Sequence, residues 1–180
     1  MTTSVDMAAL QYPIGKRTPR TAYSSESRGA VISDIAALPA KVRQAVAGLT
    51  DIQLDTPYRP DGWTVRQVVH HLADAHVILY TRAKIALTED NPPVKMWDEV
   101  PWAELPDARA MPIDVSLAMV DAVQARLTYL LKALTPDQFA RTSRHPEWGT
   151  ITVDYLVDLG VWHGKHHTAQ IRALRERSGW

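Results

Sequence analysis

The sequence predicts an all-α protein, a four-helix bundle with one long proline-rich loop, on three observations. Four long segments, beginning near Ser25, Thr64, Asp114 and Thr152, repeat apolar residues at the spacing of an amphipathic helix. Proline-rich connectors separate these segments, and no stretch shows a convincing strand pattern. Amphipathic helices of this length bury their apolar faces most readily against each other. We therefore expect a single domain over residues 1–180.

The composition is ordinary for a globular protein and excludes several kinds of site. Lys and Arg together number 20, as do Asp and Glu, so the balanced charge argues against a nucleic-acid partner. The absence of cysteine excludes disulfides, cysteine-ligated zinc and a cysteine nucleophile. Residues 1–6 lack the features of a signal peptide, and no apolar run is long enough to span a membrane. These features predict a cytoplasmic protein without a membrane partner.

The N-terminal residues 1–23 precede the first helical pattern and contain Pro13 and Pro19. We interpret them as an extended arm. Their apolar side chains predict that this arm docks on the body of the protein, through Leu10, Tyr12 and Ile14.

The first long helix is predicted from Ser25 onward. An apolar residue recurs every three or four positions, at Val31, Ile35, Leu38, Val42, Val46 and Leu49. Pro39 lies within this pattern and is expected to kink the helix or restart it, because proline removes a backbone donor. Residues 51–60 then form a connector that ends in a turn.

The second long helix is predicted to begin after Thr64. Thr64 and Gln67 fit a capping box, in which each side chain accepts a hydrogen bond from the other residue's backbone N–H. The apolar pattern continues to about Thr88. Residues 89–113 follow as a loop with five prolines, and so long a loop in a compact domain often covers a functional site. Its expected anchors are the tryptophans Trp97 and Trp102.

The third and last long helices complete the predicted bundle. The third runs from about Asp114, a plausible N-cap, to Leu134. Residues 141–149 are expected to form a loop. The last helix begins near Thr152 and ends near Ser178, just before a glycine.

The last helix carries two histidines that point in one direction. His163 and His167 are four residues apart and therefore share a helix face, which is otherwise apolar. The opposite face should be solvated, since it carries Asp154, Asp158, Lys165, Arg172 and Glu176. Two neighbouring buried imidazoles need partners, and a divalent metal ion satisfies both. The pair is thus half of a predicted metal site, and a third ligand must come from elsewhere.

Two glycines in this helix interrupt its apolar face. Gly164 stands where the H-E-x-x-H pattern of zinc proteases has glutamate, so the base of those enzymes is missing here. Gly160 and Gly164 each cost about 1 kcal/mol relative to alanine in a helix interior. The residues alone leave two explanations open, close helix packing or room for a metal ion and its open positions.

The second long helix offers three candidates for the third ligand, His70, His71 and His76. His70 and His71 lie about 100° apart around the helix, so they do not aim at one point. His70 shares its side with Asp74 and is expected to be solvated. His76 lies nearest the centre of the apolar stripe, and His71 lies at its edge. Periodicity therefore favours burial of His76 and leaves His71 and His76 as rival ligands.

Several segments of the chain closely resemble the YfiT-like branch of the DinB superfamily, and the likeness covers nearly the whole sequence. The matching segments are residues 12–15, 55–59, 62–76, 87–92, 145–146 and 162–167. The resemblance implies a four-helix bundle, a cytoplasmic homodimer and one zinc or nickel ion per subunit. It further implies His71, His163 and His167 as the metal ligands, and so selects His71, which directly precedes Leu72, over His76.

The resemblance also indicates an enzymatic function acting on a small molecule. The family is described as candidate metal-dependent hydrolases, and three histidine ligands leave an ion with open positions, as in catalytic sites. An alternative is an S-transferase that uses a low-molecular-weight thiol resembling bacillithiol, and a second is a non-catalytic metal-binding bundle. Basic and aromatic residues in 95–102 and 144–148 are candidate lining for such a thiol's pocket.

No residue is marked by its spacing as a general base. Asp74 is one turn from His71, but its side of the helix is expected to be exposed. His166 lies between the proposed ligands in sequence and flanks their face. We select His166 as the candidate catalytic residue.

Overall fold

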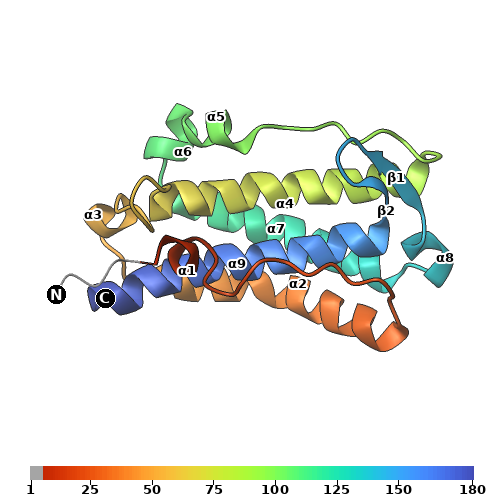
Figure 1. Cartoon of the computed structure of the whole chain (residues 1–180), viewed down its shortest axis with the longest axis horizontal. Coiled ribbons are helices and arrows are strands. Elements are labelled where there is room, and N and C mark those ends of the chain that lie inside the picture. The colour runs from red at the N-terminus through yellow and green to blue at the C-terminus, as the bar shows by residue number, and fades with distance from the viewer. Residues whose placement is uncertain (1–5) are drawn as a thin grey trace.

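The computed structural model of the chain describes residues 6–180 and contains four long helices that run side by side (Figure 1). They are α2 (Ser25–Val46), α4 (Val65–Thr88), α7 (Ile113–Lys132) and α9 (Val153–Ser178). The predicted all-α class and four-helix bundle are confirmed. Among the described residues, no helix is both long and apolar enough to cross a membrane.

The long helices pack in an order that differs from their order in the chain. Helix α4 packs against α7 and α9, and α2 packs against the same two helices. The consecutive helices α2 and α4 therefore lie diagonally across the bundle, as α7 and α9 do. A simple up-and-down bundle instead places consecutive helices side by side.

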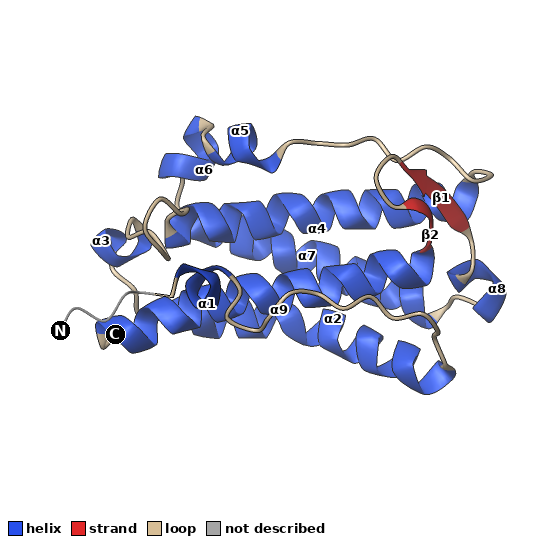
Figure 2. Ribbon diagram, in the orientation of Figure 1, coloured by secondary structure: helices blue, strands red, loops and turns tan. Residues whose placement is uncertain are grey.

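Shorter elements occupy the connections between the long helices (Figure 2). Each is four or five residues long, and they are α1 (Met7–Gln11), α3 (Asp51–Leu54), α5 (Glu99–Ala103), α6 (Pro106–Ala110), α8 (Pro136–Phe139), β1 (Thr142–His145) and β2 (Gly149–Thr152). The proline-rich loop predicted over residues 89–113 thus contains two helices, and it passes over one face of α4 (Figure 1).

The helix starts follow the capping chemistry that the sequence predicts. The backbone N–H of Gln67 donates to Thr64 Oγ1 at 3.1 Å, and the backbone N–H of Thr64 donates to Gln67 Oε1 at 2.9 Å. The predicted capping box of α4 is therefore confirmed. Asp114 was predicted as the N-cap of α7, and this is wrong, because Pro112 holds the cap position and Asp114 lies in the first turn. Helix α2 continues through Pro39 without restarting.

The expectation that the chain has no strand is also wrong. Strands β1 and β2 form an antiparallel hairpin in which Ser143 pairs with Ile151 and His145 with Gly149. Gly149 has a φ of +69°, a left-handed conformation that favours glycine at this turn. Strand β1, Thr-Ser-Arg-His, has no apolar residue, so it gives no alternating pattern for sequence analysis to detect.

The N-terminal arm docks on α9, but it is not extended throughout. Met7–Gln11 form a helix because Asp6 accepts hydrogen bonds from the first backbone N–H groups, and residues 1–5 of the predicted arm lie outside the described residues. Arg17 and Arg20 each pair with Asp158 at 3.0 Å. Arg28 pairs in the same way with Asp154 at 2.7 Å. The prediction that Asp154 and Asp158 face solvent is therefore wrong, because arginines from the arm and α2 cover that side of α9.

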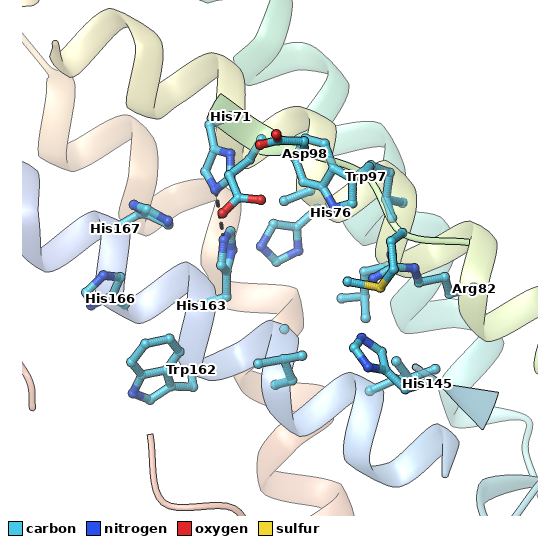
Figure 3. A pocket seen from close by; sticks show the side chains of 18 of the residues that line it. His71, His76, Arg82, Trp97, Asp98, His145, Trp162, His163, His166 and His167 are labelled. Carbon is cyan, nitrogen blue, oxygen red and sulfur yellow. Dashed lines mark hydrogen bonds between the residues drawn. The ribbon is translucent and has the colours of Figure 1, made fainter. Parts of the chain in front are cut away.

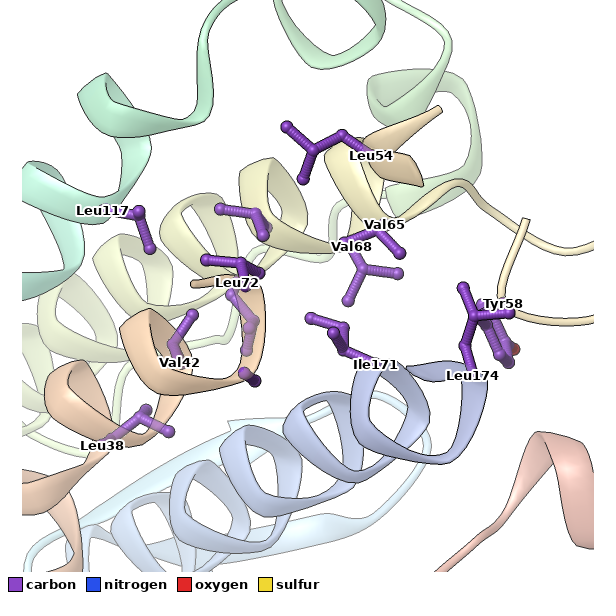
Figure 4. Close-up of a cluster of buried hydrophobic side chains, with 13 residues drawn as sticks. Leu38, Val42, Leu54, Tyr58, Val65, Val68, Leu72, Leu117, Ile171 and Leu174 are labelled. Carbon is purple, nitrogen blue, oxygen red and sulfur yellow. The ribbon is translucent and has the colours of Figure 1, made fainter. Parts of the chain in front are cut away.

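The interior contains two apolar clusters with a polar layer between them. One lies toward the start of α4 and includes Val65, Val68, Leu72, Ile171 and Leu174 (Figure 4). The other includes Leu79, Leu127, Leu131, Leu156 and Val157. Each such side chain stabilises the fold by about 1.5–3 kcal/mol when fully buried. The stretches of α4 and α9 between the two clusters carry the histidines.

Candidate metal centre

Three histidines from two helices direct ring nitrogens at one point. His71 lies on α4, and His163 and His167 lie on α9. One nitrogen from each ring falls within 4.8 Å of the other two, and the Nε2 atoms of His71 and His163 are 3.0 Å apart. Figure 3 shows these three rings at one end of a cavity. The tertiary structure thus brings together the three residues that the family resemblance selected.

Burial keeps these three imidazoles neutral. Desolvation lowers the pKa of His71, His163 and His167 well below the ordinary histidine range, and the neighbouring histidines lower each further. Neutral imidazole is the form that coordinates a metal ion. Two Nε2 atoms at 3.0 Å share a single proton at most, so the arrangement is electron-rich where a cation would bind. The donor set therefore fits a divalent ion.

Gln170 fixes the tautomer of His167. Its Nε2 donates to the carbonyl oxygen of Gln11 at 2.9 Å, which establishes the orientation of the amide. Its Oε1 then accepts a hydrogen bond from His167 Nδ1–H at 2.8 Å. The lone pair of His167 is consequently on Nε2, the nitrogen available to a metal.

His166, the candidate catalytic residue, lines the same cavity as the three histidines. Its Nε2 accepts a hydrogen bond from Gln170 at 3.0 Å, and its ring stacks on Trp162 with centroids 4.7 Å apart. Its Nδ1 therefore carries the proton and is buried without a partner among the described residues. Gln170 therefore bonds to both His166 and His167. The lone pair on Nε2 of His166 is occupied by the hydrogen bond from Gln170.

Asp74, the other candidate base, does not line this cavity. It is half-buried, and burial raises its pKa, with a smaller contribution from Asp107. Its predicted exposure is only partly correct, and it lies on a side of α4 away from the histidine group.

The prediction that His70 is solvated is wrong. His70 is buried, with Nδ1 2.7 Å from Ser116 Oγ and Nε2 3.0 Å from the carbonyl oxygen of Met111. Helix α7 and the segment before it cover this side of α4, which periodicity along α4 alone does not reveal. His70 therefore joins two helices and points away from the metal centre.

His76 is the more buried of the two rival ligands, as periodicity predicts. Its exposed fraction is 1%, against 6% for His71. Its ring lies beside His163, with centroids 5.7 Å apart, and its Nδ1 meets Gln124 Nε2 at 2.5 Å. Burial lowers its pKa to about 4. His76 borders the site without belonging to the group whose nitrogens converge.

The histidines open into a cavity of about 840 Å³. Trp63 packs on His71 with ring centroids 4.7 Å apart, and Trp97 stacks on the same ring at 5.7 Å. The proline-rich segment also supplies the carboxylates of Asp98 and Glu99 to the lining. Neither carboxylate stands out in the sequence, where the long proline-rich loop that carries them is the only indication of a role at a site.

The two glycines of α9 pack against leucines of neighbouring helices. A Cβ on Gly164 would lie 2.7 Å from both Cδ atoms of Leu38, and one on Gly160 would lie 2.3 Å from Leu79 Cδ2. Gly160 also lines the cavity. Close helix packing therefore explains Gly164, whereas Gly160 serves both packing and the shape of the cavity.

Comparison with known proteins gives relatives over almost the full length of the chain. A model of the DinB superfamily matches residues 34–171. The sequence is 46% identical over 172 residues to "Putative metal-dependent hydrolase YfiT" of Bacillus subtilis. This match covers 95% of this chain and 97% of that protein. It is also 46% identical over 174 residues to a Bacillus mycoides protein of the same description, covering 97% of this chain and all of the relative.

A solved structure of YfiT from Bacillus subtilis has the same fold. The TM-score is 0.93 at 46% identity, and the match covers 96% of this chain and 99% of that one. That structure is described as "a probable metal-dependent hydrolase with an unusual four-helix bundle topology". The diagonal placement of α2 and α4 is consistent with this description.

Proposed function

This chain belongs to the DinB superfamily, and we propose that it is a metal-dependent hydrolase acting on a small molecule. The observation that carries the proposal is the convergence of neutral ring nitrogens from His71, His163 and His167 at the end of a large cavity. The names of its relatives, which describe metal-dependent hydrolases, support the reaction class.

His71, His163 and His167 would hold one ion per chain, which we propose is zinc or nickel, because neutral imidazoles suit both metals. When bound, such an ion lowers the pKa of a coordinated water toward 7 and polarises a substrate carbonyl. Gln170 orients His167 by accepting its Nδ1–H. Trp63 and Trp97 cover the ring of His71 and limit the access of bulk water.

The proton released from water requires an acceptor in the cavity. Asp98 and Glu99 line the cavity, and Asp98 directly follows Trp97, whose ring stacks on His71. His166 lacks a free lone pair, because Nε2 accepts from Gln170. We therefore assign proton acceptance to Asp98 or Glu99, and give His166 a positioning role through Gln170.

The test combines metal analysis with hydrolysis by the same preparations. Wild-type protein, loaded separately with zinc and nickel, is assayed against a panel of aryl esters and anilides. We expect about one ion per chain and metal-dependent hydrolysis, and both should be lost in His163→Ala. His70→Ala is the matched control, since it removes a buried histidine outside the converging group. Equal metal content in wild type and His163→Ala would contradict the proposed ligands.

The same preparations separate the alternatives. Conjugation of chlorodinitrobenzene to an added small thiol, dependent on metal and without hydrolysis, would replace the hydrolase by a thiol S-transferase. Stoichiometric metal without either activity across both panels would favour the non-catalytic bundle.

We further propose that the protein is a cytoplasmic homodimer. Helix α7 exposes an apolar stripe at helical spacing, formed by Val115, Met119, Ala122 and Tyr129, and 82% of Tyr129 is exposed. Light scattering should give twice the chain mass for wild type and a smaller mass for Met119→Glu. A monomeric wild type would contradict the proposal.

A further inference from the structure

Hydrogen-bond donors gather at the end of the cavity away from the three histidines. Arg82 on α4 and His145 on β1 both line this end, and Figure 3 shows them across the cavity from His71 and His167. They lie close enough for the charge of Arg82 to lower the pKa of His145, in addition to the larger effect of burial.

Arg82 has no charged partner among the residues that the structure describes. Its Nη2 donates to the carbonyl oxygen of Lys95 at 2.8 Å, but its Nε is buried and has no hydrogen-bond partner in that part of the chain. Within residues 6–180, no carboxylate lies within the 4.0 Å of an ion pair with Arg82. Burial accordingly lowers its pKa. A partly buried charge without a counter-ion is costly to the folded state, so an anion that enters the cavity beside the guanidinium would relieve this cost.

His145 presents a donor to the same space. Its Nδ1 accepts hydrogen bonds from the backbone N–H groups of Glu147 and Trp148 at 3.2 and 3.3 Å. Backbone N–H groups only donate, so the proton of the neutral ring is on Nε2. The ring is held flat against Trp148, with centroids 3.9 Å apart and planes 6° apart. This end of the cavity therefore offers N–H groups in fixed positions.

The acidic residues of the cavity form no ion pair with Arg82 among the described residues. Asp98, Glu99 and Glu147 line the cavity, and Glu147 lies near enough to His145 to raise its pKa, although burial lowers that pKa more. Asp98 accepts the backbone N–H of Val100 instead, as the cap of α5. The remaining walls are apolar, and they combine aliphatic side chains such as Ile78, Leu79 and Leu156 with four tryptophans, Trp63, Trp97, Trp148 and Trp162.

We infer that the substrate of the proposed hydrolase carries a carboxylate or phosphate group, which Arg82 and His145 bind while its reacting bond lies near the three histidines. Only the placement of the reacting bond near the three histidines rests on the proposed function. Guanidinium and imidazole N–H groups match the planar carboxylate and the phosphate oxygens. The tryptophan walls fit an apolar or aromatic body between the two ends.

The test measures binding of small aromatic probes to metal-free protein at pH 7.5, by calorimetry and tryptophan fluorescence. Benzoate and phenyl phosphate represent the two anionic groups, and benzamide is the neutral equivalent of benzoate. We expect at least one anion to bind about tenfold more tightly than benzamide, as a charged hydrogen bond in a shielded site provides. The ratio of the dissociation constants of benzoate and phenyl phosphate identifies the preferred anionic group.

Substitutions of Arg82 then test whether the preference for anions arises at this end of the cavity. Arg82→Gln should reduce the anion preference to about twofold or less, whereas Arg82→Lys should keep part of it. Arg172→Gln removes an exposed arginine bonded to Gln44, and it should bind as wild type does. Circular dichroism of each variant shows whether it folds. If Arg82→Gln does not fold, a reduced anion preference in Arg82→Lys is the result that tests the inference.

Two results would overturn the inference: benzamide binding as tightly as both anions, or an undiminished anion preference in Arg82→Gln. Because these measurements use metal-free protein, they are independent of metal content and hydrolysis. Anion binding without hydrolysis would contradict only the proposed reaction, and hydrolysis without anion preference would contradict only this inference.

Discussion

At the scale of single residues, adjacent histidines on α4 have different roles because different helices face them. His71 points toward α9, where it meets His163, whereas His70 points toward α7, where it contacts Ser116. The two side chains have the same chemistry and nearly equal burial. The neighbouring helix alone decides which one can be a ligand.

Substitution of these two histidines should have opposite consequences. His70→Ala leaves the hydroxyl of Ser116 and the carbonyl of Met111 without their partner, so it should lower the free energy of unfolding by about 1–3 kcal/mol and leave metal content unchanged. His71→Ala should abolish metal binding. Urea denaturation and elemental analysis of both variants check this, and loss of metal in His70→Ala alone would reverse the assignment.

Gln170 orients His167 by one hydrogen bond, and its amide also bonds to His166 and to the carbonyl oxygen of Gln11. Gln170→Met has a similar size but accepts no hydrogen bond, so it should reduce metal affinity about 10- to 100-fold. Gln170→Glu retains an acceptor for His167 Nδ1–H but loses the donors to Gln11 and His166, so its metal affinity should fall less than that of Gln170→Met. Competition with a chromogenic chelator measures all three affinities. Equal affinities in Gln170→Met and Gln170→Glu would mean that the bond does not orient the ligand.

At the scale of elements, α9 combines packing and function along one helix. Its start is held by arginine pairs to Asp154 and Asp158, its middle carries the histidine pair, and Ile171 and Leu174 enter the apolar core. Gly164 lets this helix approach α2 closely, because a side chain there would overlap Leu38. The spacing of α9 from its neighbours therefore sets the position of its histidines.

Two glycine substitutions should separate helix propensity from packing. Gly29 lies in α2 with open space around it, so Gly29→Ala should raise the free energy of unfolding by about 0.5–1 kcal/mol. Gly164→Ala has the same gain in propensity, but its Cβ displaces buried Leu38 at a cost of about 1–3 kcal/mol. We expect net destabilisation, measured by urea denaturation. An increase in stability for Gly164→Ala would show that Leu38 moves aside freely.

At the scale of the whole molecule, all seven histidines have pKa values lowered chiefly by burial. The unfolded chain therefore binds more protons than the folded one as pH falls below about 6.5. Stability should be full above that pH and decline toward pH 4. For His76, whose pKa is about 4, the loss at pH 5 is about 2 kcal/mol.

Urea denaturation of metal-free protein between pH 7.5 and 5 tests this dependence. The free energy of unfolding should fall steadily as the pH is lowered, and the fall should be smaller in His76→Phe, which lacks one titrating group. A free energy that stays constant over this interval would contradict the burial of the histidines.

The sequence by itself determined the four long helices, the capping box of α4 and the direction of the histidine pair. Apolar periodicity reports which way a side chain points from its own helix axis, and it correctly placed His76 deepest and His163 beside His167. The capping box at Thr64 depends on residues three positions apart, so it too was readable. Periodicity left His71 and His76 as rival third ligands, and the family resemblance selected His71.

Only the tertiary structure decided which element meets each face. Asp158 is buried because the N-terminal arm covers it, and His70 because α7 does, although both look solvated from their own helices. The convergence of His71 with the histidines of α9, and the presence of Arg82 and His145 in one cavity, likewise depend on segments distant in the chain. The physical reason is that burial and ligand geometry depend on contacts between helices, and a pattern along one helix contains no information about its neighbours.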